Sequence, residues 1–316
     1  MIKNSEIKKI LSKEGLNISS IKKLDIGTSR NSYLLISNKK KYVLKLYDKK
    51  EKGKIQKKID YIKKINKKKK ITTIPINSKV LKFKNTIGYF YEFFEGVHYR
   101  EIKIPRKLFK FGQIVGEFSK QSSKITSKNI KYDNLGKRAI KDSKKTIKFL
   151  ENKKGFYKET SKIMKEGLPL IDTSNFKKCR MRIVHGDIHF ENVLYNKKQN
   201  KYQIIDIDGT WIKIIPIEIL VIISYSLSNS TSNNKRIIKE IIKGYESKFK
   251  LTRSEKQSIP SLLILRKNGE IIWLLDKVLN KRFNEKEFRK FTTHSRNNLR
   301  TIIDNFEELK KIFNEI

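Results

Sequence analysis

The residues that could do chemistry gather in one stretch, residues 181–210, which reads MRIVHGDIHFENVLYNKKQNKYQIIDIDGT. His185, Asp187 and His189 alternate in it, so an extended segment would present all three on one face. Asn192 follows Asp187 by five residues, and the two apolar runs RIV and YQII both lead into polar side chains. Loops that follow rigid elements carry many binding and catalytic groups, so we expect a site here.

Two chemistries fit this stretch. In the first, Asp187 is the base or orienting group for a substrate hydroxyl. Asn192 and Asp206 then hold Mg²⁺, whose preferred ligands are carboxylate and amide oxygens. In the second, Zn²⁺ or a pair of metals serves hydrolysis and is held by His185, Asp187, His189 and Asp206. Only the first chemistry requires a phosphate-positioning lysine on an earlier strand.

Such a lysine is present in the segment KYVLKLYD. Lys45 shares a strand face there with Val43 and Tyr47, and the turn GTSRNS precedes the segment. A lysine within an apolar strand loses much of its solvation unless it meets an anion. Lys45 therefore favours the phosphate chemistry, although a chain this rich in lysine leaves the hydrolase open.

The charge of the chain is strongly positive: 74 Lys and Arg stand against 32 Asp and Glu, a formal net charge of +42. Such a charge is typical of proteins that bind polyanions. Most of these cations are lysines at unconstrained positions, as in YIKKINKKKKI, whereas base readers and phosphate clamps rely on the arginine fork. We therefore expect a solvated surface and no nucleic-acid partner, with a polyanion-binding surface as the alternative.

The compartment follows from three further features. Cys179 is the single cysteine, so no intrachain disulfide can form and a reducing compartment fits. The start MIKNSEIKKI lacks the apolar core of a signal peptide. The most apolar segment, IIPIEILVIISYSL, contains Pro216 and Glu218 and is too short to span a bilayer. We expect a soluble cytoplasmic protein without membrane insertion.

Hydrophobic periodicity predicts the elements that must position the site. Residues 1–95 predict a small β-rich part, with a helix at 5–14, three strands within 20–48, an inserted helix at 51–66 and two further strands. Residues 96–316 predict a larger, mainly helical part, apart from short strands in the stretch 181–210. Its helices are expected at 107–124, 138–153, 216–228, 234–249, 254–280 and 296–315.

The segments HGDIHFENVL and IIDIDG together resemble the catalytic and metal segments of the aminoglycoside phosphotransferase/choline kinase-like superfamily. LDIGTSRNSYLL and KYVLKLYD resemble the first three strands of that superfamily, and YFYEFFEGV resembles its hinge. The segment IIKGYESKFKLTRSEKQSIPSLLILRKNGEIIWLL is similar to the C-terminal helices of its homoserine kinase type II-like branch. The resemblance covers most of the chain. It implies a bilobal, protein-kinase-like α+β fold with a nucleotide-binding N-lobe at 1–95 and a mainly helical C-lobe at 96–316.

The resemblance implies a role for each matching residue. The superfamily's catalytic aspartate falls on Asp187, and its metal-binding asparagine and aspartate fall on Asn192 and Asp206. Its phosphate-contacting lysine falls on Lys45, for which Asp60 is the expected acidic partner. ATP and Mg²⁺ are therefore the implied cofactors.

The resemblance also implies an adenine site in the N-lobe. Val43 and Leu194 would line the adenine from above and below, and the backbones of Glu92 and Phe94 would meet its edge. Gly27 falls in the nucleotide loop, where relatives often have two glycines.

Six further residues are candidates for the acceptor site. Asp208 occupies a position that is often acidic in relatives and would assist the metal or the substrate. His189 would touch the substrate or phosphate, or brace the loop, as we expect for His185. The floor of the acceptor pocket is expected from Trp211, Arg266 and Trp273, and a contact to a cationic or hydroxylated group from Glu218. The structural alternatives are core packing for the aromatic residues and helix capping for Glu218.

A small acceptor is expected because few residues separate Asp208 from Pro216, where a helix is predicted to start. Peptide-binding kinases commonly need an activation segment there, and no Ala-Pro-Glu follows. The sequence thus predicts an ATP-dependent phosphotransferase that moves the γ-phosphoryl group to a hydroxyl of an amino alcohol, a sugar or an antibiotic. The alternatives are an atypical protein kinase, a metal-dependent hydrolase, and a basic nucleotide- or nucleic-acid-binding module without catalysis.

Overall fold

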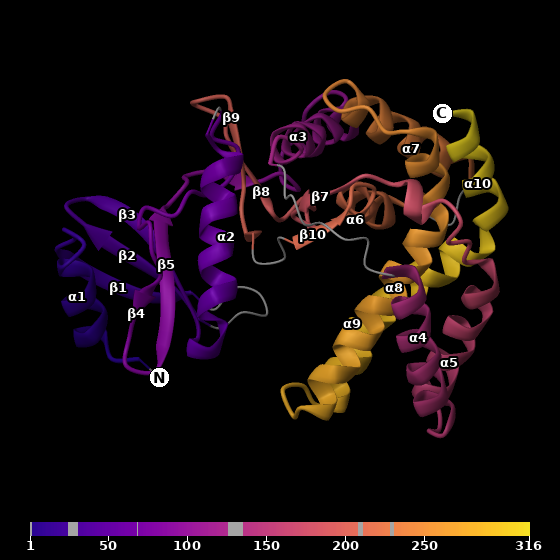
Figure 1. Ribbon diagram of the computed structural model, residues 1–316, viewed down its shortest axis with the longest axis horizontal. Helices are drawn as coiled ribbons and strands as arrows, with labels where there is room; N and C mark the ends of the chain where they lie inside the picture. The colour runs from indigo at the N-terminus through magenta and orange to yellow at the C-terminus, as the bar shows by residue number, and fades with distance from the viewer. Residues whose placement is uncertain (1, 25–30, 68, 126–134, 208–210, 228–230) are drawn as a thin grey trace. The chain divides into compact units, whose positions relative to one another are not determined.

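The computed structural model describes residues 2–24, 31–67, 69–125, 135–207, 211–227 and 231–316 (Figure 1). Gly27 and Asp208 lie outside these residues, as does the side chain of Trp211. The chain forms two compact units, each described below by itself. The first unit comprises Met1–Ile102 and Phe190–Thr210, and the second comprises Lys103–His189 and Trp211–Ile316. The predicted division at residue 95 stays a prediction.

The first unit contains a five-stranded antiparallel sheet in the order β1-β2-β3-β5-β4 (Figure 1). Its strands are β1 (Ile18–Leu24), β2 (Ser32–Ser37), β3 (Lys40–Asp48), β4 (Leu81–Lys82) and β5 (Thr86–Glu92). The helices of the unit are α1 (Asn4–Ser12), the 3-10 turn η1 (Lys49–Glu51) and α2 (Lys52–Ile65). A smaller sheet in the order β6-β8-β9 consists of β6 (Val97–His98), β8 (Val193–Asn196) and β9 (Lys201–Ile204).

Alternate residues of β3 pack into different apolar clusters, as the period of a strand requires. Leu44 packs in one cluster with Ile7 of α1, and Val43 packs in another with Ile59 of α2. Lys45 is two residues from Val43 and therefore lies on the α2 side of the sheet. The strand thus carries a lysine into an apolar face, as the sequence predicted.

The hairpin of β8 and β9 positions the two predicted metal ligands. Val193 pairs with Ile204, so Asn192 precedes the first paired residue and Asp206 follows the last by two. The Ile205 amide donates to the Asn192 carbonyl oxygen at 2.9 Å, which extends the pairing beyond the strands. The hairpin therefore brings residues 14 apart in sequence, Asn192 and Asp206, to the same end of one sheet.

The second unit is mainly helical. Its helices are α3 (Lys107–Ser122), α4 (Leu135–Glu151), α5 (Phe156–Gly167), α6 (Ile217–Ser226), α7 (Thr231–Glu246), α8 (Arg253–Leu279), α9 (Glu285–Asp304) and α10 (Phe306–Glu315). Two 3-10 turns, η2 (Leu168–Leu170) and η3 (Phe176–Lys178), precede the strand β7 (Met181–Val184), which pairs antiparallel with β10 (Trp211–Ile214).

Helix α6 lies in the core of the second unit, since every residue from 217 to 224 is buried. A helix that is apolar all round has no solvent face, so the carboxylate of Glu218 is buried with it. Helices α3 and α7 pack closely, because a Cβ at Gly244 would lie 2.0 Å from the Phe109 carbonyl oxygen. These contacts belong to the same unit as the loop after β7, which carries Asp187.

The α+β fold class predicted from the sequence is confirmed: a sheet-rich unit is followed by a mainly helical one. Four elements differ from the expectation. Helix α5 and strands β6 and β10 lie where the sequence analysis placed none, and the helix predicted at 296–315 is two helices. Helix α9 begins earlier because Asn284 and Glu287 form a capping box, and the helix ends before Asn305.

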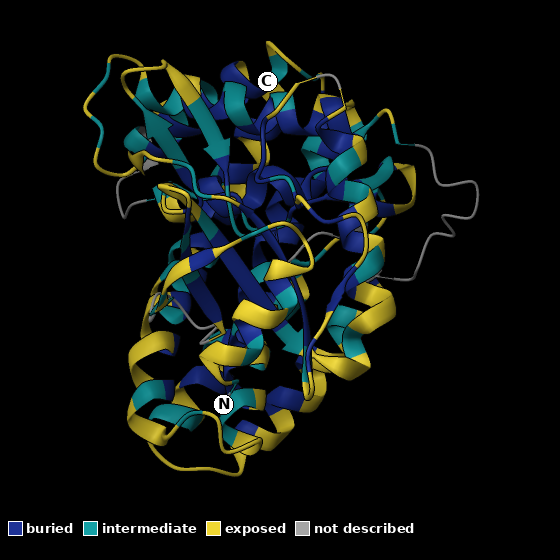
Figure 2. Ribbon diagram, turned by 90° about the vertical axis from the view of Figure 1, so that its left-hand side faces the viewer, coloured by how far each residue is buried: buried dark blue, intermediate teal, exposed yellow. Residues whose placement is uncertain are grey.

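Lysines cover the exposed helix faces, which are yellow in Figure 2. Among the lysines of the described ranges, only Lys45, Lys58 and Lys267 are buried. A buried ammonium is costly unless an anion or a ring compensates it, so these three mark places where the fold requires a cation. In the described part of the chain, no helix is long and apolar enough to cross a membrane.

Candidate functional site

Lys45 and Asp206 form an ion pair within the first unit, with 2.6 Å between Lys45 Nζ and Asp206 Oδ1. The side chain of Lys45 is 10% exposed, whereas that of Asp206 is 44% exposed. Charge-assisted bonds of this length compensate part of the desolvation of the ammonium. The aspartate after β9 therefore supplies the anion that the position of Lys45 requires.

Asp206 adopts a left-handed backbone conformation, with a φ of 57°. Residues other than glycine hold such a conformation at a cost on the order of 1–3 kcal/mol, which aspartate and asparagine bear more readily than most, and some of these residues cluster at functional sites. Asn192, at the other end of the hairpin, is 8% exposed. The hairpin thus brings an amide and a carboxylate, whose oxygens suit Mg²⁺, to the same end of one sheet.

The alternative metal site receives no support from the side-chain arrangement. Within the described ranges, no three His, Cys, Asp or Glu side chains gather in a geometry that could hold a metal ion. His185 is fully buried and meets the ring of Phe118 edge-on at 6.0 Å, so it packs in the core of the second unit.

The residues predicted for adenine lie on adjoining elements of the first unit. Val43 on β3 is 7% exposed, and the neighbouring β5 ends at Glu92, which pairs with Tyr42. The Asn196 side chain of β8 donates to the Glu95 carbonyl oxygen at 2.7 Å, so Leu194 belongs to a strand tied to the segment after β5. Contacts of these residues and of Phe94 with a nucleotide stay predictions.

Asp60 does not occupy the position expected of a partner for Lys45. It is exposed on α2 and accepts a hydrogen bond from Gln56 Nε2 at 3.1 Å. The inward face of α2 carries Ile55, Ile59 and the buried Lys58, because these positions recur with the helical period. The carboxylate bonded to Lys45 is Asp206, from a distant part of the sequence.

Asp187 lies in the second unit, two residues after the buried His185. The turn between them passes through Gly186, whose φ of 76° is a conformation that suits glycine. The Asp187 side chain is 49% exposed. The catalytic aspartate expected from the sequence is thus presented on a tight turn, open to a reactant.

Glu218 of α6 bonds the backbone of this turn. Its carboxylate accepts the Gly186 N–H at 3.1 Å, and the residue is 1% exposed. Burial raises the pKa of Glu218 to about 8, against the opposing effect of the Gly186 and His185 amides. The expectation that Glu218 meets a substrate is therefore corrected, because its carboxylate faces the backbone of the catalytic loop.

Arg266 of α8 bonds the same loop from another side. Its Nη1 donates to the Gly186 carbonyl oxygen at 2.9 Å, and its Nη2 donates to Asp187 Oδ1 at 3.2 Å. His189 Nε2 lies 3.8 Å from Asp187 Oδ2. Arg266 and His189 thus flank the two oxygens of one carboxylate, a role more specific than the pocket floor expected for Arg266.

Sequence analysis missed the carboxylate that braces Arg266. Glu270 Oε1 lies 3.2 Å from Arg266 Nε, while its Oε2 accepts from Lys267 Nζ at 2.8 Å and from Ser295 Oγ at 3.0 Å. Burial alone would raise the pKa of Glu270, but Lys267 and Arg266 outweigh it and hold the pKa below its usual value. The signal was the charged group RKNGE inside an otherwise apolar helix.

Tyr225 at the end of α6 was also missed. Its ring stacks on the His189 imidazole, with centroids 5.4 Å apart and planes at 9°, and it remains 49% exposed. Trp273 is 45% exposed on α8 and meets Phe283 edge-on at 6.4 Å. Trp273 follows Arg266 by seven residues and therefore shares its helix face, so its substrate role stays a prediction.

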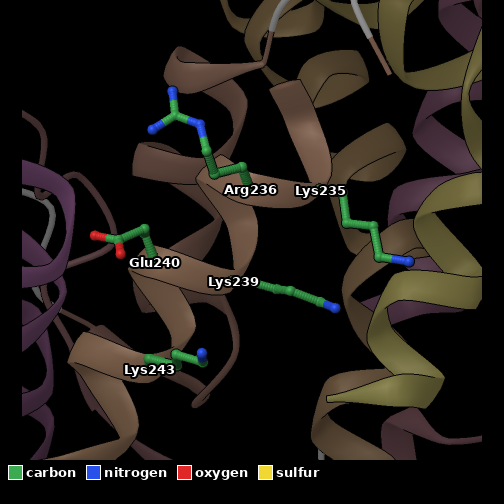
Figure 3. Close-up of a pocket in the computed structure, with 5 residues that line it drawn as sticks. All are labelled: Lys235, Arg236, Lys239, Glu240 and Lys243. Atoms are coloured by element: carbon green, nitrogen blue, oxygen red, sulfur yellow. The ribbon is translucent and has the colours of Figure 1, made fainter. Parts of the chain in front are cut away.

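A separate pocket lies along α7 in the second unit. Figure 3 shows its lining, and its volume is about 470 Å³. The lining residues are Lys235, Arg236, Lys239, Glu240 and Lys243. Lys235 Nζ is 3.1 Å from Glu315 Oε2 of α10, so part of this positive charge is compensated within the unit. The residues predicted for the site do not line this pocket.

No family model matches the chain, and no curated protein matches it. Solved structures match it over nearly their full length. A microcompartment-associated aminopropanol kinase aligns over 98% of this chain and 99% of its own, with 14% identity and a TM-score of 0.69. An amicoumacin kinase in complex with AMP-PNP and Ca²⁺ aligns over 96% of both chains, with 16% identity and a TM-score of 0.65.

A third match is a spectinomycin phosphotransferase in complex with ADP and spectinomycin. It aligns over 100% of this chain and 99% of its own, with 14% identity and a TM-score of 0.67. These likenesses show that the chain has the kinase-like α+β fold of these structures, as the resemblance implied. The homoserine kinase type II-like branch stays a prediction.

Proposed function

We propose that the protein is an ATP-dependent phosphotransferase that moves the γ-phosphoryl group to a hydroxyl of a small molecule. The observation that carries the proposal is the Lys45–Asp206 ion pair beside Asn192, on a kinase-like fold. The three matching structures are two small-molecule kinases and a phosphotransferase of an antibiotic, and two of them contain a nucleotide. The localisation that we propose is the cytoplasm, because the lone Cys179 is buried as a free thiol.

The first unit would bind the nucleotide. Lys45 holds an ammonium in an apolar face, where it can meet the α- and β-phosphates. Asn192 and Asp206 would hold Mg²⁺, which neutralises the triphosphate when it is bound. The phosphates would be a second anion for the ammonium of Lys45, and the carboxylate of Asp206, which is half-exposed, would be available as a metal ligand. Val43 and Leu194 would cover the adenine.

The second unit would supply the base. Asp187 accepts the proton of the acceptor hydroxyl, whose oxygen forms a bond to the γ-phosphorus as the bond to the β-phosphate bridging oxygen breaks and ADP leaves. Arg266 keeps the carboxylate oriented, and Glu218 fixes the turn that presents it. Such positioning is the main contribution that a protein makes to phosphoryl transfer.

The test is an ADP-release assay on the purified protein with Mg·ATP and a panel of metabolite alcohols. We expect at least one alcohol to stimulate ADP release, and Asp206→Ala to lose both this activity and the affinity for Mg·ATP. Asp142→Ala, which removes an exposed carboxylate of α4, is the matched control and should behave as wild type. Unchanged nucleotide affinity in Asp206→Ala would contradict the metal role, and product release without ATP would indicate a hydrolase.

A further inference from the structure

An aromatic surface lies next to the carboxylate of Asp187, and its nearest member is the His189 side chain. His189 Nε2 lies 3.8 Å from Asp187 Oδ2, and the His189 ring stacks on Tyr225. The ring of His294 meets Tyr225 from α9, with centroids 5.5 Å apart. We call Tyr225, His189 and His294 the aromatic shelf. All three lie in the second unit with Asp187.

The exposure of Tyr225 is unusual for its helix. The eight residues of α6 that precede it, 217–224, are all buried, whereas Tyr225 is 49% exposed. Parallel stacking on His189 fixes the plane of the Tyr225 ring. The ammonium of Lys267 lies over the ring, with Nζ 5.6 Å from the ring centroid. A rigid, half-exposed ring beside a reactive carboxylate is suited to bind the flat face of a ligand.

The charges around the shelf define which ligand fits. Of the carboxylates around Asp187, Glu270 already accepts from Lys267 and Ser295 and pairs with Arg266. Glu218 is buried and bonds the Gly186 amide. Both are committed to the protein, so in the described part of the second unit neither Glu270 nor Glu218 is placed to receive an ammonium group of a ligand.

The cations of the same region act on Asp187 directly. Arg266 bonds its carboxylate. Burial lowers the pKa of Lys267 and of the partly buried Lys213, and both side chains also interact weakly with Asp187. An acceptor with several ammonium groups would bring like charges against these side chains, which lowers affinity. A neutral hydroxyl compound meets no such repulsion, and an anionic one is attracted.

We propose that the acceptor binds on the aromatic shelf and is a neutral or anionic hydroxyl compound, such as a sugar or a hydroxy acid, with an apolar face that stacks on Tyr225. Polycationic antibiotics and quaternary amino alcohols are disfavoured. The inference rests on the proposed phosphotransfer, because it names the class of acceptor for the same reaction. Tyr225 determines specificity, and Arg266 with Lys267 sets the charge that the acceptor must have.

The first experiment compares acceptors of similar size that carry no charge, an ammonium or a carboxylate, together with two cationic compounds. ADP release is measured with glucose, glucosamine and glucuronate, with 1-propanol, 3-amino-1-propanol and 3-hydroxypropionate, and with kanamycin and choline. We expect a neutral or anionic member to exceed its ammonium counterpart at least tenfold in kcat/KM. The proposal is overturned if the ammonium compounds match or exceed their counterparts. It is also overturned if no neutral or anionic member either turns over or inhibits.

The second experiment uses variants of the shelf. Tyr225→Ala should raise the KM of the best acceptor at least tenfold while the KM of ATP stays unchanged, and Tyr225→Phe should retain most of the affinity. Phe291→Ala removes an aromatic side chain of α9 that is 41% exposed and is the matched control, with no change in either KM. An unchanged acceptor KM in Tyr225→Ala, or an equal rise in Phe291→Ala, would remove Tyr225 from the acceptor site.

Failure of this inference can be told apart from failure of the proposed function. ATP consumption that requires Mg²⁺ and an added alcohol, and that is lost in Asp206→Ala, shows that the protein is a phosphotransferase, whatever the charge of that alcohol. A protein that consumes ATP and prefers ammonium acceptors refutes the charge inference alone. A protein that consumes no ATP with any acceptor refutes the proposed function and the inference together.

Discussion

The two aspartates proposed for the chemistry are held in opposite ways. Asp206, in the first unit, has a strained backbone and a half-exposed side chain that one long side chain, Lys45, holds from β3. Asp187, in the second unit, sits on a relaxed glycine turn and is flanked by Arg266 and His189. Arg266 in turn pairs with the carboxylate of Glu270, and both side chains are largely buried.

Because of this difference, Asp206 can exchange its partner when ligands bind, whereas Asp187 is already oriented before they bind. The Lys45–Asp206 pair can open when phosphates and a metal compete for its two ends, since each end then gains an equivalent partner. The Asp187 side chain is braced by a buried ionic group, which costs desolvation energy but removes the need to reorganise during the reaction. We therefore expect substitutions in the first unit to change nucleotide binding, and those around Asp187 to change turnover and stability.

The largest expected effect is that of Asp187→Asn. The amide keeps the shape of the side chain but accepts no proton, so kcat should fall by about 10²–10⁴. ATP affinity should stay as in wild type, because the proposed nucleotide contacts lie in the first unit. ADP release and a nucleotide titration measure the two quantities. Unimpaired turnover would show that another group takes the proton, and the comparison of the two aspartates would then fail.

The next effect concerns the brace itself. Glu270→Gln leaves the ammonium of Lys267, which is fully buried, without its carboxylate. Removing one partner of a buried pair costs about 3–5 kcal/mol, and urea unfolding should show a loss of this size. The double variant Lys267→Met/Glu270→Gln should recover part of the loss, since no unpaired charge remains.

The control for this prediction is Glu285→Gln, at the start of α9. Glu285 also pairs with an arginine, Arg289, at 2.8 Å, but both side chains are more than half exposed. The control should change the free energy of unfolding by less than about 1 kcal/mol. Equal effects of Glu270→Gln and Glu285→Gln would mean that the pairing of Glu270 with Lys267 contributes no more to stability than an exposed ion pair.

The fold could be predicted from the sequence because its signals are local. Strand alternation in β3 and the helical period of α2 gave both elements nearly to the residue. Helix α5 was missed because its apolar positions are few, and the boundary at Asn305 because two amphipathic helices in succession show one continuous period. Strand β10 is four residues long and depends on its partner β7.

The site could be predicted only in part, since motif positions are local but their partners are not. The segment HGDIHFENVL gave Asp187 and Asn192, whereas the ion pair of Lys45 joins residues 161 apart in sequence. Asp60 was chosen because α2 offers few acids, but the helix turns it outward. No local pattern indicates that Tyr225 stacks on His189, because that contact depends on how α6 packs beneath the catalytic loop.

A pH-dependent effect is expected from Glu218, the buried carboxylate under the turn that carries Asp187. Its pKa is raised from 4.5 to about 8 in the folded protein, so the folded state retains a proton that the unfolded state releases. The resulting stability is present below pH 4.5 and is lost as the pH rises through about 8, with a slope of at most about 1.4 kcal/mol per pH unit.

Glu218→Gln removes this titration while its side-chain oxygen can still accept the Gly186 amide. Urea midpoints at pH 5, 6, 7 and 8 should therefore favour the variant progressively over wild type as the pH increases. A parallel pH dependence in both proteins would show that Glu218 is ionised throughout, and that the turn bearing Asp187 is not supported by a neutral acid.

The smallest effect is expected from Arg100→Ala, which provides the sharpest contrast for the Lys45–Asp206 pair. Arg100 Nη1 lies 2.8 Å from Glu191 Oε1, and this pair, like the other, joins the segment Phe190–Thr210 to the rest of the first unit. Its side chains are 72% and 55% exposed, so water competes for both charges. Its loss should cost less than about 1 kcal/mol and leave kcat and ATP affinity unchanged. A loss of ATP affinity in Arg100→Ala would mean that every ion pair that joins the segment Phe190–Thr210 to the rest of the first unit shapes the nucleotide site. Lys45 would then differ from Arg100 only in that its charge is buried.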